Sequence, residues 1–129
     1  MAVATINLET KLLQFSGAYN PLYIIRSGEL VQYKADRMPV AFYSKPREFS
    51  LQEIQLKEGD SFYTFSDGMI DQFGGALYRK FLTKRLKNTL LENHQYSMKI
   101  QKKALDMAIS KWMDNHQQID DMVVLGVRV

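Results

Sequence analysis

The stretch GDSFYTFSDG, residues 59–68, predicts a β-strand that ends abruptly in a polar loop. Residues 61–65 form an apolar and aromatic run, which is the composition of a strand. Glu58-Gly59 supplies a turn before this run, and Ser66-Asp67-Gly68 brings it to a stop. A loop that directly abuts a strand is held by a rigid scaffold, so its side chains can be aimed into a shared space.

The N-terminal side of this stretch reads as short strands punctuated by turns, because β-branched and aromatic residues come in brief runs bounded by Gly, Asn, Asp or Pro. We expect two hairpins, formed by residues 2–7 with 11–17 and by residues 22–26 with 30–34. Proline in Arg37-Met38-Pro39 and in Ser44-Lys45-Pro46 then predicts an irregular segment. Residues 49–56 alternate again and predict a further strand.

On the C-terminal side, the hydrophobic period changes from two to about 3.6 after Gly74-Gly75, which predicts helices. The first helix is expected to bury one face, consisting of Leu82, Leu86, Leu90 and Leu91. A second helix is expected to begin with Ser97 as its N-cap and to bury a stripe formed by Leu105, Ala108, Ile109 and Trp112.

The chain closes with an apolar run at residues 122–129, which predicts a last strand buried on both faces. The helices are therefore expected to cover one face of an antiparallel sheet, while another layer covers the opposite face. This combination predicts a fold of the α+β class.

Composition is that of an ordinary soluble domain, with 129 residues, 46% apolar and 24% charged. The sequence contains no cysteine. Disulfides, thiolate zinc sites and cysteine nucleophiles are therefore excluded, and a metal would have to sit on oxygen or imidazole ligands.

The net charge of +3 comes largely from lysines and arginines in residues 79–111, where they alternate with apolar residues at helical spacing. Without interleaved aromatic residues or a known binding motif, this pattern predicts a solvated helix face and no nucleic-acid interface. No run approaches the roughly eighteen apolar residues of a membrane span, and no signal peptide is evident. We expect a cytoplasmic segment that makes no membrane contact.

Two acidic clusters abut predicted strands: Asp67 with Asp71, and Asp120 with Asp121. Carboxylates that are brought together repel unless a proton or cation lies between them, and oxygen ligands favour Mg²⁺, Mn²⁺ or Ca²⁺. The alternative interpretation is a turn at Asp67-Gly68 and a polar break before the last strand. Spacing alone favours this alternative, because Asp and Gly are the commonest turn residues.

Three segments in order resemble the SpoIIE-type, metal-dependent serine/threonine protein phosphatases of bacteria. Residues 15–22 (FSGAYNPL) look like that family's glycine-containing hairpin and Asn-Pro motif. Residues 59–68 are similar to its strand and Ser-Asp-Gly loop, and residues 118–124 (QIDDMVV) look like its Asp-Asp segment before the closing strand. The resemblance covers nearly the whole chain and identifies it as the C-terminal part, residues 1–129, of a single such domain.

The resemblance implies an antiparallel β-sandwich flanked by helices, of which this chain would hold a truncated portion with two C-terminal helices and a closing strand. It implies two Mn²⁺ or Mg²⁺ ions at one end of the sandwich, with Asp67 and Asp120 as metal ligands. Asp71 matches a position that holds a weaker additional ion in some type-2C enzymes. Asp121 would support the ligands. The histidines, His94 and His116, flank predicted helix ends and are interpreted as solvated or capping residues.

The implied reaction is hydrolysis of phosphoserine or phosphothreonine by a metal-bridging water. The implied substrate is a phosphorylated regulatory protein of the anti-anti-sigma type, and the parent protein could carry sensory modules or a membrane attachment. No residue of this chain is assigned a covalent catalytic role.

The sequence departs from the family pattern in one respect, because the Asp-Gly motif that bridges both ions and a further acidic ligand are not in these 129 residues. We therefore expect the isolated chain to be inactive and to self-associate through its open strand edge. The missing ligands keep a second hypothesis open, a non-catalytic interaction module that dimerises. A nucleotide-binding or calcium-binding domain would need a glycine-rich phosphate loop or a twelve-residue calcium loop, and neither is present.

Overall fold

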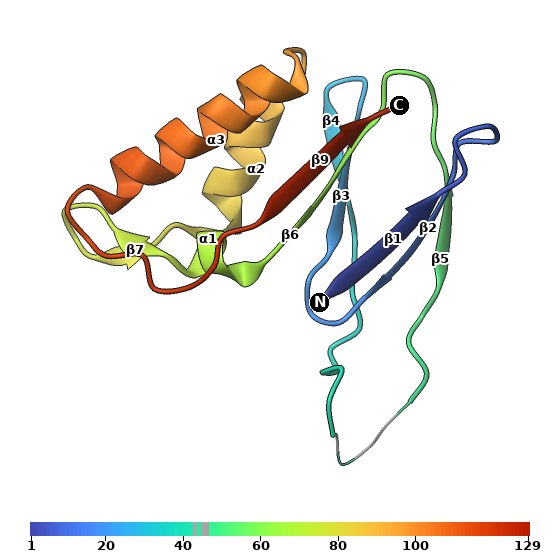
Figure 1. The fold of residues 1–129 in the computed structure, drawn as a ribbon, viewed down its shortest axis with the longest axis horizontal. Helices are drawn as coiled ribbons and strands as arrows, with labels where there is room; N and C mark the ends of the chain where they lie inside the picture. The colour runs from blue at the N-terminus through green and yellow to red at the C-terminus, as the bar shows by residue number, and fades with distance from the viewer. Residues whose placement is uncertain (43, 45–46) are drawn as a thin grey trace.

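The computed structural model describes residues 1–42, 44 and 47–129, and these residues form two antiparallel sheets that stack face to face, with helices outside one of them (Figure 1). One sheet has three strands, in the order β1 (Ala2–Ile6), β2 (Leu12–Gly17) and β5 (Gln52–Gln55). The other sheet has four strands, in the order β4 (Glu29–Tyr33), β3 (Leu22–Arg26), β6 (Ser61–Phe65) and β9 (Val124–Arg128). The α+β sandwich expected from the sequence is confirmed.

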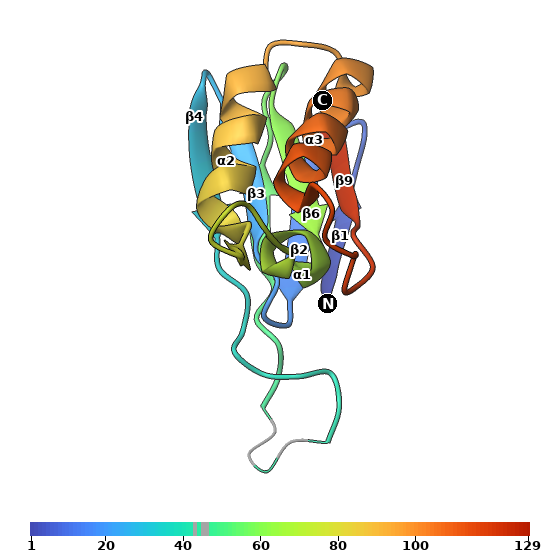
Figure 2. The same cartoon turned by 90° about the vertical axis from the view of Figure 1, so that its left-hand side faces the viewer.

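The remaining elements lie on the outer side of the four-stranded sheet (Figure 2). They are α1 (Asp67–Asp71), α2 (Leu82–Asn93), α3 (Met98–Met113) and a two-stranded ribbon of β7 (Phe73–Gly74) and β8 (Arg79–Lys80). α2 and α3 lie side by side over this sheet, with α1 near one end of it. No helix in the described part of the chain is both long and apolar enough to cross a bilayer.

Both predicted hairpins are present, with ends within one residue of the expected ones. In the first, β1 pairs with β2 from Ala2↔Gly17 to Ile6↔Leu13. In the second, Arg26 faces Glu29 across a two-residue turn. Ser27 and Gly28 of this turn have φ of 50° and 81°, the left-handed conformation that such hairpin turns require.

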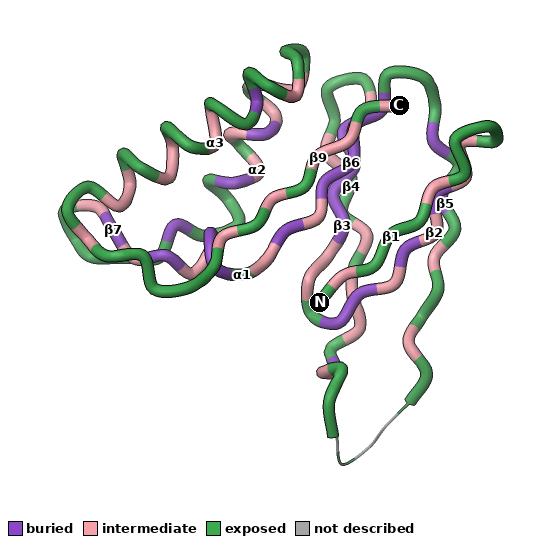
Figure 3. The backbone as a smooth tube through the Cα atoms, viewed as in Figure 1, coloured by how far each residue is buried: buried purple, intermediate pink, exposed green. Residues whose placement is uncertain are grey.

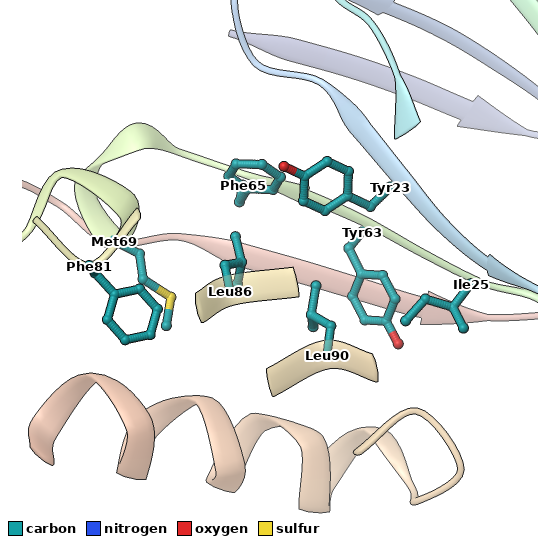
Figure 4. Close-up of a cluster of buried hydrophobic side chains, with 8 residues drawn as sticks. All are labelled: Tyr23, Ile25, Tyr63, Phe65, Met69, Phe81, Leu86 and Leu90. Carbon is teal, nitrogen blue, oxygen red and sulfur yellow. The ribbon is translucent and has the colours of Figure 1, made fainter. Parts of the chain in front are cut away.

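β6 is one of the two inner strands of the four-stranded sheet: it pairs with β3 on one side and with β9 on the other, and it contributes to both hydrophobic cores. Phe62 points into the core between the two sheets. Tyr63 and Phe65 point the opposite way and pack with residues of β3, α1 and α2, including Leu86 and Leu90 (Figure 4). Buried backbone therefore follows β6 and β3 through the middle of the molecule (Figure 3).

The two long helices form as expected, but their buried faces are narrower than the sequence predicted. In α2, Leu86 and Leu90 are buried and Leu91 is partly buried, whereas Leu82 is 50% exposed. Leu82 occupies the first position of the helix and has a φ of 70°, so its side chain lies outside the stripe that continues from Leu86. In α3, Ser97 caps the N-terminus by accepting a hydrogen bond from the amide of Ile100, as predicted.

The α3 stripe packs against the core, but all four of its residues remain only partly buried: Leu105, Ala108, Ile109 and Trp112. The predicted double burial of the last strand is wrong. β9 forms an edge of the four-stranded sheet, and Val123 and Leu125 are 58% and 56% exposed. Among the described residues, no second strand pairs with the outer edge of β9.

A buried ion pair holds the end of the sandwich where β6 begins. Asp60 is 2% exposed and accepts hydrogen bonds from Nε of Arg26 at 3.0 Å and from the amide of Lys57 at 2.9 Å. Burial by itself raises the pKa of the Asp60 carboxyl, but the hydrogen bonds and the positive charge of Arg26 together outweigh burial and hold the pKa below its ordinary value. Asp60 is therefore a structural residue and stays ionised at neutral pH.

We predict that Asp60→Asn lowers the free energy of unfolding by about 2–3 kcal/mol at pH 7, since the partly buried Arg26 would lose the counter-charge of the buried Asp60 carboxylate. The folded-state pKa of Asp60 lies below that of the unfolded chain, about 3.9, so the pair stabilises fully above that value. Its contribution is lost as pH falls through the folded-state pKa. Urea unfolding, followed by tryptophan fluorescence from pH 7 to pH 3, measures both effects.

Glu58→Gln is the matched control, because Glu58 pairs with Lys11 on the surface and its loss should change stability by less than about 1 kcal/mol. A structural role for the Arg26–Asp60 pair would be contradicted if the two variants were equally destabilised. It would also be contradicted if Asp60→Asn lost as much unfolding free energy at low pH as the wild type.

Candidate functional site

The candidate site lies at the opposite end of β6 from the Arg26–Asp60 pair. Here the chain leaves β6 at Phe65 and continues directly into α1, so the predicted polar loop at Asp67 is in fact the first turn of a short helix. The irregular segment of residues 114–123, which connects α3 to β9, passes beside α1 (Figures 1 and 2). The two acidic segments adjoin neighbouring strands, because β6 pairs with β9 from Ser61↔Arg128 to Phe65↔Val124.

Ser66 joins the two segments just beyond the last strand pair. Its hydroxyl oxygen donates to the carbonyl of Asp121 at 2.9 Å and accepts from the amide of Val123 at 2.9 Å. Its own amide donates to the carbonyl of Val123 at 2.9 Å. These three hydrogen bonds, one from the backbone and two from the side chain of Ser66, extend the β6–β9 connection as far as Asp121.

Gly68 is required at its position by close packing. A Cβ atom built on Gly68 would lie 2.3 Å from the carbonyl oxygen of Asp121, a separation that non-bonded atoms do not tolerate. The pattern Asp67-Gly68 therefore reflects the approach of another backbone segment, in addition to the turn tendency that the sequence suggested. The backbones that carry Asp67 and Asp120 are consequently in direct contact.

The two main candidate ligands present accessible carboxylates. Asp67 and Asp120 are both exposed, and Oδ1 of Asp120 accepts a hydrogen bond from the amide of Asp121 at 2.7 Å. Asp121 is also exposed, and its carbonyl is held by Ser66. Among the residues that the structure describes, neither Asp67 nor Asp120 forms an ion pair of the kind that neutralises Asp60. The roles of Asp67 and Asp120 as metal ligands stay predictions.

Asp71 is held differently from Asp67. It ends α1, one turn after Asp67, and its Oδ1 accepts a hydrogen bond from Nζ of Lys80 in β8 at 2.9 Å. Both side chains of this pair are a little under half exposed. A cation at Asp71 would have to compete with the Lys80 ammonium group, which agrees with the weaker ion that the family resemblance implied for this position.

The donor types fit a hard divalent cation, but the number of donors does not. Among residues 1–42, 44 and 47–129, no three or more acidic or histidine side chains are grouped so as to hold a metal ion. These residues therefore do not by themselves hold a complete divalent-cation centre.

His94, His116 and Gly17 have structural roles and do not belong to the candidate site. His94 and His116 follow α2 and α3, and their Nδ1 atoms hydrogen-bond to carbonyls one turn earlier, of Leu91 and Met113. Gly17 is required by packing, because a Cβ atom there would lie 2.7 Å from the carbonyl oxygen of Asn20. Backbone geometry therefore accounts for Gly17.

Sequence reasoning missed Gln72, which follows α1 and is completely buried. Its side-chain amide contacts the backbone of the segment that leads to Asp120, at Gln117 and Ile119. A glutamine next to a helix end is usually a surface residue. The one local signal of its burial in the sequence is its position between Asp71 and the apolar Phe73.

Comparison with known proteins places this geometry in a family. The model of the family "Stage II sporulation protein E (SpoIIE)" matches residues 1–129. The SiaA-PP2C domain of Pseudomonas aeruginosa superposes with a TM-score of 0.90 at 25% identity, over 99% of this chain and 50% of that one. The phosphatase domain of SpoIIE from Bacillus subtilis gives a TM-score of 0.73 at 18% identity, over 99% and 57%.

The S. agalactiae serine/threonine phosphatase gives a lower TM-score of 0.58 at 16% identity, over 92% of this chain and 55% of that one. A comparison with curated proteins found no match. The chain thus spans about half the length of the solved domains that it resembles. With the family model matched from end to end, the chain belongs to the SpoIIE family and carries part of a PP2C-type phosphatase domain.

Proposed function

We propose that this chain forms the C-terminal part of a metal-dependent protein serine/threonine phosphatase domain. The observation that carries the proposal is the direct contact between the Ser66 to Gly68 segment and the Asp120-Asp121 segment at the end of β6. This contact brings together two acidic motifs that lie more than fifty residues apart in the sequence. Membership of the SpoIIE family supports the same interpretation.

In this proposal Asp67 and Asp120 bind Mn²⁺ or Mg²⁺, and Asp71 binds a weaker additional ion. The remaining ligands would come from outside this chain, since its described residues contain no group of three or more candidate ligands. Bound ions would supply an activated water and neutralise phosphoryl oxygens. Mn²⁺ is a reasonable first choice, because a B. subtilis SpoIIE phosphatase domain was presoaked with it.

The proposed substrate is phosphoserine or phosphothreonine on a regulatory protein of the anti-anti-sigma type, within a bacterial signalling or partner-switching system. Asp67 and Asp120 are exposed at the end of the sandwich, where a protein-bound phosphate can reach them. The substrate is therefore expected to approach along this end and not through an enclosed pocket. The cytoplasm is the proposed location of the domain.

We predict that Asp67→Asn in the full-length protein lowers kcat/KM for a phosphoserine peptide about 100-fold or more, since it removes a charged metal ligand. The thermal unfolding midpoint should change little, because Asp67 is exposed and packs into no core. Asp106→Asn is the matched control, the same chemical change at an exposed site on α3. Wild-type turnover by Asp67→Asn in Mn²⁺ would show that Asp67 is no ligand.

The 129-residue chain by itself is predicted to release no phosphate from the same peptide above the rate of a blank. Its described residues anchor one side of the metal centre only, and a two-ion clamp needs carboxylates from both sides. A phosphate-release assay with 1–129 across a series of Mn²⁺ concentrations measures this directly. Robust turnover dependent on Mn²⁺ would mean that this chain holds a complete site.

A second candidate function, an interaction module that self-associates, is favoured by the outer edge of β9. No strand of the described residues pairs with this edge. Beside it, α3 and β9 enclose a largely apolar groove of about 860 Å³, which includes Leu105, Ile109 and Leu125. An unpaired strand edge next to exposed apolar side chains is a template for pairing with another chain.

We propose a second copy of this chain as the occupant of this edge when the chain is alone. Antiparallel pairing of two β9 strands around a two-fold axis would satisfy both edges and close the assembly. Lys102 and Asp106 lie in the same groove, so a two-fold related copy can place opposite charges across the contact.

We predict that the wild-type chain sediments as a dimer and that Leu125→Lys shifts it to the monomer, because the lysine charge would be buried against the partner strand. Val31→Lys is the matched control, since Val31 is 46% exposed on β4, the other edge of the same sheet. A monomeric wild type, or an equal effect of the two variants in sedimentation velocity, would contradict association through β9.

A further inference from the structure

Gln72 lies between the two backbone segments that carry the candidate ligands. It directly follows Asp71 at the end of α1, and its side chain is 0% exposed. Nε2 donates to the carbonyl of Gln117 at 2.8 Å and to the carbonyl of Phe73 at 3.0 Å. Oε1 accepts from the amide of Ile119 at 3.1 Å. Both amide hydrogens and the amide oxygen are therefore used.

The backbone of Gln72 is fixed as well, so the side chain starts from a defined point. Its carbonyl accepts hydrogen bonds from the amide of Phe81 at 2.8 Å and from the indole of Trp112 at 3.3 Å. These contacts tie Gln72 to the start of α2 and the end of α3. The amide side chain thus connects a firmly held backbone position with the segment of residues 117–119.

This segment needs such a connection, because it has no regular secondary structure to hold it. Residues 116–119 lie between the end of α3 at Met113 and the start of β9 at Val124, outside any helix or strand. Two side chains of the α1 region hydrogen-bond to the backbone of this connection, residues 114–123: Gln72 at Gln117 and Ile119, and Ser66 at Asp121 and Val123. Asp120 lies between these two attachment points.

We propose that Gln72 is a positioning residue for the divalent-cation site, an inference that rests on the proposed phosphatase function. Its buried amide fixes the distance between the α1 segment, with Asp67 and Asp71, and the segment that carries Asp120. Metal ligands must be held within about 0.5 Å of their productive positions, and residues behind the ligands provide that restraint. Gln72 contacts no ion itself and acts through the backbone of residues 117–119.

The test is Gln72→Met in the full-length protein, which preserves side-chain length but removes all three side-chain hydrogen bonds. We expect Mn²⁺ binding to weaken about 10- to 100-fold, the usual effect of losing a residue that orients metal ligands. Mn²⁺ binding is measured from the electron paramagnetic resonance signal of free Mn²⁺, which requires no turnover. Activity of the variant should recover as Mn²⁺ is raised.

Gln101→Met is the matched control, because Gln101 is also a buried glutamine with three side-chain hydrogen bonds. Its amide bonds to the hydroxyl of Tyr63 at 2.7 Å and to the carbonyls of Tyr96 and His94, and it touches neither acidic segment. The two variants should lower the unfolding midpoint similarly, whereas only Gln72→Met should weaken Mn²⁺ binding. A purely structural role for Gln72 would leave the two indistinguishable in Mn²⁺ affinity.

Gln72→Asn provides a second variant in case the methionine is not tolerated, since it keeps a polar amide that is one methylene too short to reach both Gln117 and Ile119. It should also weaken Mn²⁺ binding. Wild-type Mn²⁺ affinity in a folded Gln72 variant would overturn this inference and leave the proposed function intact. A wild-type protein that neither binds Mn²⁺ nor releases phosphate would overturn the proposed function, and this inference with it.

Discussion

The burial of β6 on both faces is the constraint on which the rest of the structure depends. Phe62 enters the core between the two sheets, while Tyr63 and Phe65 enter the core beneath the helices. Exposing either face of such a strand to water is unfavourable. The three-stranded sheet therefore covers one face, and the two long helices cover the other. The layers of the sandwich and the position of the candidate site at one end follow from this requirement.

Carboxylates lie in opposite environments at the two ends of β6. The carboxylate at one end has a structural role, whereas those at the other end are candidates for function. At the start of the strand, Asp60 is buried and neutralised by Arg26. Beyond its end, Asp67 and Asp120 remain exposed while the backbone around them is held tightly by hydrogen bonds. Rigid backbone combined with accessible carboxylates is the arrangement expected of a surface that binds a cation with the help of further ligands.

Family membership and the limits of this chain are consistent with each other. The chain superposes on phosphatase domains about twice its length. The open edge of β9 and the groove beside α3 lie where the described residues provide no further strand. The uncovered edge of β9 agrees with a chain that spans about half the length of the solved domains that it resembles.

The sequence by itself determined the hairpins, the bounds of β6, the helix capped by Ser97 and the family, because these depend on local periodicity, turn residues and short motifs. It also identified Asp67 and Asp120 as candidates. Only the tertiary structure decided that Leu125 is exposed at a sheet edge, that Asp71 pairs with Lys80 and that Gln72 holds the Asp120 segment. Each of these depends on which distant segments become neighbours, and no local pattern encodes that.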